Sequence, residues 1–128
     1  MRILVSDPIS EKGVQILREA GHEVDINTGN DEAALCEIIK SYDALIVRSQ
    51  SQITEDVIES SDKLKIIGRA GVGVDNISIP AATRKGIVVV NSPDGNTMAA
   101  AEHTLALMMS LARNIPQADQ SLRLSRET

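Results

Sequence analysis

The chain has 128 residues, of which 42% are hydrophobic and 24% charged, a composition typical of one globular domain. A formal net charge of −5 and a single aromatic residue argue against a polynucleotide partner, because such surfaces need basic excess or aromatic side chains for base stacking. The lone Cys36 excludes an intramolecular disulfide and a cysteine-based zinc site, and we expect a packed thiol. We expect no metal site.

The amino terminus, MRILVSDPIS, has neither the long apolar region nor the small-residue cleavage site of a signal peptide. No apolar run approaches the length of a membrane span. We therefore expect a protein of the reducing cytoplasm with no membrane partner.

Short apolar runs alternate with helical patterns along the first ninety or so residues. Good N-cap residues, Ser10, Asp31 and Thr54, precede three expected helices, and a fourth is expected near 79–85. The runs lack alternation, which is typical of strands covered on both faces. Five such runs separated by helices predict an α/β fold with a flavodoxin-like, doubly wound, five-stranded parallel sheet. The expected strands are 3–5, 23–26, 44–47, 64–68 and 87–90.

From Thr97 the pattern changes to that of one long helix with an apolar face. Pro116 is expected to kink or interrupt this helix. We therefore divide the chain into a sheet domain, 1–96, and a long C-terminal helix, 97–128.

The candidate site residues follow the strands, because ligands of open parallel sheets bind beyond the carboxyl ends of the strands. Arg48 and Ser49 follow the third strand, and Arg69 with the turn Gly71–Gly73 follows the fourth. Arginine offers a planar donor fork for carboxylate or phosphate, and a glycine turn can present bare amides. These residues predict one wall of a cleft for a small anion. Solvated surface arginines and a turn without a ligand are the alternatives.

A dinucleotide fingerprint is a poor interpretation of the glycine turn. Gly71 and Gly73 match its first two glycines, but Asn76 stands at the third position, and the short helix that follows contains Pro80. We therefore expect no cofactor site in this chain. His103 lies among apolar helical residues and is interpreted as packed or partly exposed, not as a catalytic base.

The motifs VRS, GRAGVGVDN, ATRKGI, VNSPDGN and AAEHT together resemble the amino-terminal domain of the D-2-hydroxy-acid dehydrogenases, particularly the members that oxidise 3-phosphoglycerate. The resemblance covers almost the whole chain. It implies that Arg48 and Arg69 contact a small anionic substrate similar to 3-phosphoglycerate. It also implies that the amides of Val72 and Gly73 hold the substrate carboxylate.

The resemblance further implies that Asn96 lines an interdomain cleft and that the long helix crosses to a nucleotide-binding domain. Thr104 would then lie near the nicotinamide of NAD. The family's cofactor fingerprint and its catalytic arginine, histidine and supporting carboxylate would lie outside these residues. The expected function is that of an isolated substrate-binding domain, inactive alone, whose parent is an NAD-dependent enzyme of serine biosynthesis.

Two other interpretations of the sequence are possible. A phospho-receiver domain has the same kind of sheet. Such a domain needs an aspartate at the end of its third strand, where this chain has Arg48 and Ser49, and a lysine after its fifth strand, where this chain has Asn91 and Ser92. The other is a stand-alone or engineered flavodoxin-like scaffold without a ligand. Exposed apolar residues of the long helix, such as Leu105 and Met108, would then form a homodimer or fold the helix back onto its own sheet.

Overall fold

The computed structural model describes residues 1–125. The chain separates into two compact units, Met1–Gly95 and a second unit that begins at Asn96. This division lies one residue before the predicted boundary. Residues 126–128, the end of the predicted helical segment, lie outside the described residues.

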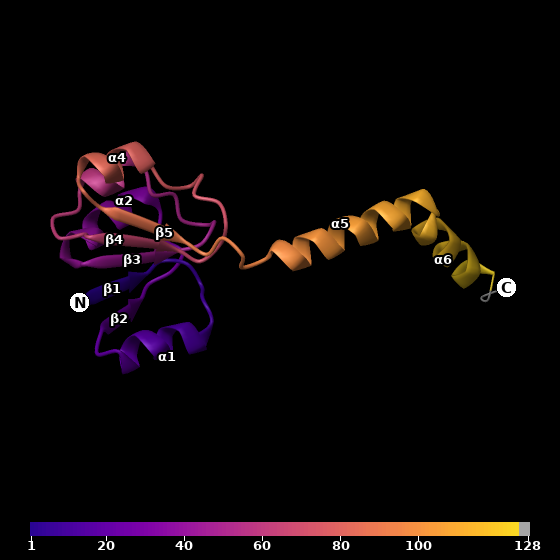
Figure 1. Ribbon diagram of the computed structural model, residues 1–128, viewed down its shortest axis with the longest axis horizontal. Helices are drawn as coiled ribbons and strands as arrows, with labels where there is room; N and C mark the ends of the chain where they lie inside the picture. Colours follow the sequence, from indigo (N-terminus) through magenta and orange to yellow (C-terminus); the bar gives the residue numbers. More distant parts are fainter. Residues whose placement is uncertain (126–128) are drawn as a thin grey trace. The chain divides into compact units, whose positions relative to one another are not determined.

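The first unit is built on five parallel strands in the order β2-β1-β3-β4-β5 (Figure 1). This order reverses between β1 and β3, as in flavodoxin-like sheets, and confirms the predicted fold. The strands are β1 (Arg2–Val5), β2 (Glu23–Ile26), β3 (Ala44–Val47), β4 (Ile66–Arg69) and β5 (Val88–Asn91).

The last two strands begin later than predicted. Leu64 and Ile87 were expected to open β4 and β5, but they precede the paired residues and lie buried in the core. Their apolar character serves core packing and not strand pairing, which the sequence pattern does not distinguish.

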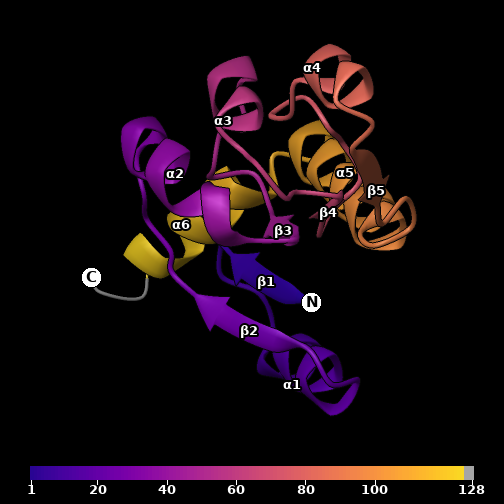
Figure 2. The ribbon, with the colours of Figure 1, turned by 90° about the vertical axis from the view of Figure 1, so that its left-hand side faces the viewer.

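Helices lie on both faces of the sheet (Figure 2). One face is covered by α2 (Glu32–Ile38), the short helix η1 (Ile39–Ser41), α3 (Glu55–Glu59) and α4 (Ile79–Arg84), which share the larger core cluster with Leu4, Leu45 and Ile67. On the other face α1 (Glu11–Glu19) packs Val14 against Ile3 and Val5. The predicted caps are confirmed: the side chains of Ser10, Asp31 and Thr54 each accept a hydrogen bond from the amide three residues ahead.

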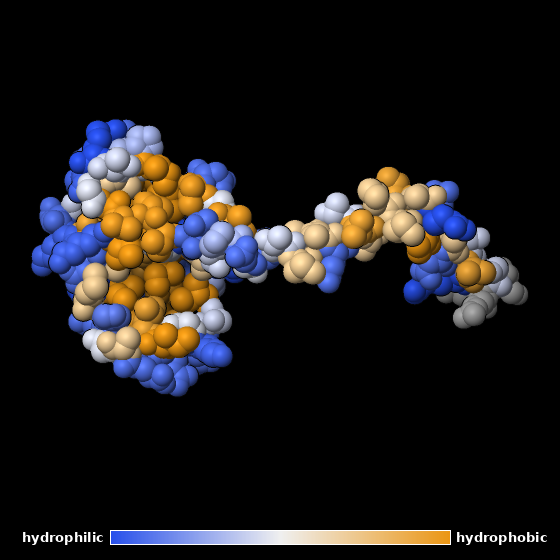
Figure 3. Space-filling view, in the orientation of Figure 1, coloured by the Kyte–Doolittle hydropathy of each residue, from blue (hydrophilic) through white to orange (hydrophobic). Residues whose placement is uncertain are grey.

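The expectation that all strands are covered on both faces is wrong for β5. Val88 is 56% exposed and Val90 is 45% exposed. On the face of the sheet that carries α1, this helix packs over β1, and no other described helix of residues 1–95 covers β5 on that face. Figure 3 shows the resulting apolar surface of the first unit, between α1 and α4.

The second unit contains α5 (Thr97–Ala112) and α6 (Ile115–Leu124). The predicted long helix is therefore present, but it breaks at Asn114, whose φ of 50° is left-handed, and not at Pro116. Pro116 lies in the first turn of α6, where a helix has no need of its amide, and asparagine tolerates the left-handed conformation. No helix within residues 1–125 is both long and apolar enough to span a membrane.

Candidate functional site

The two candidate arginines stand on neighbouring strands at the carboxyl edge of the sheet. Arg69 is the last residue of β4 and pairs with Val47, the last residue of β3, so Arg48 lies one residue further along. The amide of Ala70 donates to the carbonyl of Val47 at 2.8 Å and continues the pairing past the strand ends. The prediction that both arginines share one edge of a parallel sheet is confirmed.

Both guanidinium groups keep their charge unpaired within the part of the chain that the structure describes. Neither Arg48 nor Arg69 makes a salt bridge with any described acidic side chain. Arg48 is exposed and reaches the carbonyl of Pro8 with Nη1 at 3.5 Å, whereas Arg69 is half-buried. Two positively charged side chains therefore stand at this edge of the sheet.

The glycine turn is held against the end of β5. The amide of Gly71 donates to the carbonyl of Arg69 at 2.9 Å, and the amide of Ser92 donates to the carbonyl of Gly71 at 3.0 Å. The Asn91 side chain donates to the carbonyl of Val72 at 2.6 Å. Among residues 1–125, the amides of Val72 and Gly73 donate to no protein acceptor. The turn therefore offers two bare donors, as a small-anion site requires.

Gly71 makes room for a neighbouring side chain. A β-carbon at position 71 would lie 2.9 Å from Cζ of Arg69 and still closer to Nη1. Its backbone φ is not left-handed, so the glycine matters here only because the Arg69 guanidinium lies over it. The sequence interpretation, bare backbone facing an anion, did not include this contact.

Two hollows border the arginines and meet at Ala70. An apolar groove of about 630 Å³ is lined by Arg48 and Ala70 together with residues of α1. A smaller hollow of about 220 Å³ is lined by Arg69, Ala70 and Asn91. Both hollows are open to solvent, and Val72 and Gly73 line neither of them.

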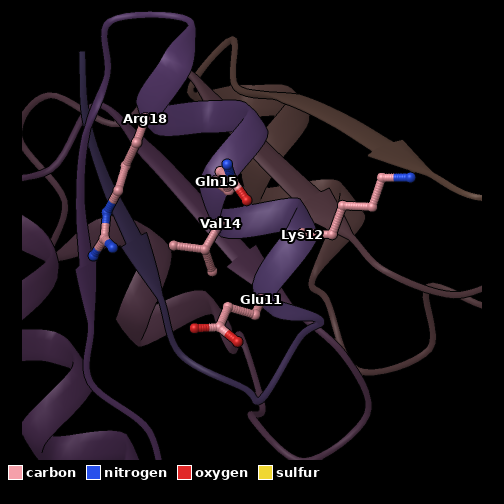
Figure 4. A pocket seen from close by; sticks show the side chains of 5 residues that line it. All are labelled: Glu11, Lys12, Val14, Gln15 and Arg18. Carbon is pink, nitrogen blue, oxygen red and sulfur yellow. The ribbon is translucent and has the colours of Figure 1, made fainter.

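A further hollow lies on the outer surface of α1. Its lining side chains point in different directions, with Lys12 directed away from Glu11 and Arg18 (Figure 4). Because these charges do not converge on one point, this hollow is not a candidate site.

Asp7 is a buried residue of this edge that was not predicted as part of the site. It is 1% exposed, and its carboxylate accepts hydrogen bonds from the amides of Arg48 at 2.6 Å, Gln50 at 3.1 Å and Ser51 at 3.0 Å. The Ser51 hydroxyl adds a bond at 2.6 Å. Burial by itself raises the pKa of the Asp7 carboxyl, but the hydrogen bonds from Ser51, Arg48 and Gln50 outweigh it and hold the pKa below its ordinary value. Its position directly after a buried strand was the available signal.

Asn76 is the second such residue. Its side chain is buried, and Nδ2 donates to the carbonyl of Arg48 at 2.8 Å and to that of Ser51 at 2.7 Å. The sequence singled out Asn76 only as a departure from a dinucleotide fingerprint. The structure gives that departure a structural role.

The segment after β4 does not fit a dinucleotide phosphate. In that type of site a glycine turn leads directly into a helix whose amino end faces the phosphates. Here Asn76 turns its side chain inward, and α4 begins only at Ile79 and has six residues. We assign no cofactor to this turn.

Of the remaining predicted residues, Ser49 lies in the loop after β3, and Asn96 and Thr104 lie in the second unit. Ser49 is exposed beside Arg48. Asn96 occupies the N-cap position of α5, and its carbonyl accepts from the amide of Ala100 at 2.8 Å. The Thr104 hydroxyl donates to the carbonyl of Ala100 at 2.7 Å. The roles of Asn96 in a cleft and of Thr104 near a nicotinamide stay predictions.

Comparison with known proteins gives a consistent result. Residues 3–125 match the family described as "D-isomer specific 2-hydroxyacid dehydrogenase, catalytic domain". The chain is 56% identical over 125 residues to a D-3-phosphoglycerate dehydrogenase of Synechocystis and 52% identical over 123 residues to one of Archaeoglobus fulgidus. These matches cover 98% and 96% of this chain but 22% and 23% of the relatives, so the chain spans about a fifth of their length.

A solved structure is similar as well. The NAD⁺-bound 3-phosphoglycerate dehydrogenase of Entamoeba histolytica superposes with a TM-score of 0.77 at 39% identity. The superposition covers 86% of this chain and 38% of that one.

Proposed function

Because the chain belongs to the D-isomer specific 2-hydroxyacid dehydrogenase family, we propose that it forms the substrate-binding part of an NAD-dependent 3-phosphoglycerate dehydrogenase. The parent enzyme would act in serine biosynthesis in the cytoplasm. The homology to D-3-phosphoglycerate dehydrogenases over nearly the whole chain supports this choice of substrate.

The observation that carries the proposal is the pair of unpaired arginines beside two bare amides. 3-Phosphoglycerate has a carboxylate and a phosphate, and the edge offers Arg48, Arg69 and the amides of Val72 and Gly73 as donors for two anionic groups. Arginine binds either group through two parallel N–H donors, and a turn of successive amides suits a carboxylate.

The groups that we propose bind the anion, two arginines and two backbone amides, include no catalytic base. Oxidation of a hydroxy acid needs a base for the hydroxyl proton and a cation to polarise the developing carbonyl. Among the described residues at this edge, the buried carboxylate of Asp7 already accepts hydrogen bonds from four donor groups. NAD would supply the redox chemistry in the parent enzyme, from outside the residues that form this edge.

A titration with 3-phosphoglycerate tests the proposal. We expect the amide resonances of Val72 and Gly73 to shift with millimolar affinity, about −4 kcal/mol, because one wall of a cleft cannot exclude water. Arg48→Met and Arg69→Met should each weaken binding about tenfold. Lys12→Met removes an equal charge from α1 and should leave the affinity unchanged. Absence of any shift in the unmodified chain would retire the proposal.

A second property is proposed for the molecule itself, namely self-association through α5. Its apolar side chains are largely exposed, with Leu105 at 58%, Met108 at 61% and Leu111 at 77%. Apolar surface of this extent favours association of two copies. Light scattering should give the mass of a homodimer, and Leu111→Lys should shift it towards the monomer. A monomeric mass for the unmodified chain at high concentration would contradict this.

A further inference from the structure

The loop that carries Arg48 is held from beneath by two buried side chains of opposite hydrogen-bonding character. Asp7 draws three of its backbone amides inward, those of Arg48, Gln50 and Ser51. Asn76 donates from one Nδ2 atom to two of its carbonyls, those of Arg48 and Ser51. The loop path is thereby fixed by one acceptor group and one donor group.

Asn76 also belongs to the other half of the candidate site. It lies in the same connection as Arg69 and the glycine turn, which runs from β4 to α4. The two connections continue side by side: the amide of Ile53 donates to the carbonyl of Asn76, and the amide of Ser78 donates to the carbonyl of Ile53, both at 2.8 Å. The loop after β3 and the loop after β4 therefore form one connected body.

The arrangement leaves one amide of the Arg48 loop unused. The amide of Ser49 donates to no protein acceptor within residues 1–125, although those of Arg48, Gln50 and Ser51 all bond Asp7. This free amide belongs to the residue that directly follows Arg48 in the chain.

We propose that Asp7 and Asn76 are positioning residues, a buried clamp that sets the Arg48 loop relative to the glycine turn and so prepares the edge for an anion. This inference rests on the proposed function. In this inference Asp7 and Asn76 do not contact the substrate and act only through the loop. The chemistry of each position is specific: asparagine at position 7 would turn an N–H₂ group towards backbone amides, and aspartate at position 76 would turn a carboxylate towards two carbonyl oxygens.

The test compares near-isosteric variants by amide-resolved NMR with 3-phosphoglycerate as the probe. Asp7→Asn and Asn76→Asp should each weaken binding by at least about fivefold while both arginines remain in place. Amide exchange at positions 48, 50 and 51 should accelerate, with the strands β1 and β3 still protected. The milder Ser51→Ala removes one hydroxyl donor and keeps all three backbone bonds, so it should fold even if the others do not and weaken binding about twofold.

Asp25→Asn is the matched control. Asp25 is also a carboxylate in a hydrogen-bond network, with Tyr42 at 2.8 Å and Arg2 at 2.8 Å, but it lies in β2, outside the Arg48 loop. It should leave 3-phosphoglycerate affinity and the exchange of amides 48–51 unchanged.

The outcomes separate this inference from the proposed function. If the unmodified chain binds and the Asp7, Asn76 and Ser51 variants bind equally well, the clamp has no positioning role and the inference is overturned, while the proposed function stands. If the unmodified chain does not bind, the proposed function fails and the inference that rests on it fails with it, whatever the exchange at amides 48, 50 and 51 shows.

Discussion

The guanidinium of Arg69 occupies the space that a side chain at position 71 would need. Gly71→Ala should therefore displace the far end of a flexible side chain and leave the backbone in place. We expect the free energy of unfolding to change by less than about 1 kcal/mol, but affinity for 3-phosphoglycerate to fall about tenfold. Urea unfolding and the NMR titration measure the two quantities. Unchanged affinity would show that Arg69 does not need its present position.

Asp7 predicts a particular pH dependence of stability. Burial raises the pKa of Asp7 but the hydrogen bonds from Ser51, Arg48 and Gln50 outweigh it, so the pKa is lower in the folded than in the unfolded chain. Such a carboxylate contributes stability that is fully present above its unfolded pKa of about 4 and is lost as the pH falls through the folded pKa.

Urea unfolding of the unmodified chain and of Asp7→Asn across acidic pH isolates this contribution. At neutral pH the variant should be less stable by about 2 kcal/mol, and the difference should shrink below about pH 4. Asp25 and Asp43 also have pKa values below their ordinary range, but they are common to both proteins and cancel in the comparison. A difference that does not vary with pH would contradict the assignment.

The sequence was enough to predict those site residues that directly follow a strand, because strand order alone fixes where they lie. Arg48 and Arg69 could be found because each adjoins the end of an apolar run, and parallel strands end at the same edge. The same rule places Asp7 at this edge, but its role and that of Asn76 could not be predicted, because they depend on how the loop after β3 bends back beneath the edge, which no periodicity encodes.

At the scale of elements, Lys85 joins α4 to α3. Its ammonium donates to the carbonyls of Ile58 at 2.9 Å, Glu59 at 2.7 Å and Ser61 at 2.8 Å, which lie at the carboxyl end of α3. All three of its donors are used, and the positive charge is favourable at that end of a helix.

Lys85→Met should lower the free energy of unfolding by about 1.5 kcal/mol, because the carbonyls of Ile58, Glu59 and Ser61 each lose the hydrogen bond from Lys85. Arg84→Met is the control: it removes a neighbouring charge whose partner Glu55 is exposed, and such pairs contribute about 0–1 kcal/mol. Chemical denaturation measures both. An equal loss of unfolding free energy in the two variants would show that Lys85 acts only through its charge and not through its three hydrogen bonds.

Prediction of the elements succeeded where caps and periodicity act locally. The caps at Ser10, Asp31 and Thr54 placed three helices correctly. The break between α5 and α6 was misplaced, because Pro116 is a stronger signal than Asn114 yet fits the first turn of a helix without cost.

At the scale of the whole molecule, the proposed anion site would form one wall of a cleft, and the chain spans about a fifth of the relatives that it matches, 22% and 23% of their lengths. We expect no NAD-dependent oxidation of 3-phosphoglycerate by these 128 residues, because the proposed anion site consists of two arginines and two backbone amides, and none of these groups can take up the hydroxyl proton. An absorbance assay for NADH checks this, and turnover that depends on Arg48 would contradict it.

The account depends most on Arg48, Arg69 and the glycine turn acting as one anion site. Arginine side-chain Nε–H resonances, followed together with the amides of Val72 and Gly73 during a 3-phosphoglycerate titration, test this directly. The account predicts that all four signals shift with a single dissociation constant while the Nε–H of Arg84 stays in place. Signals from Arg48 and Arg69 that stay unchanged, or that follow different dissociation constants from the two amides, would contradict it.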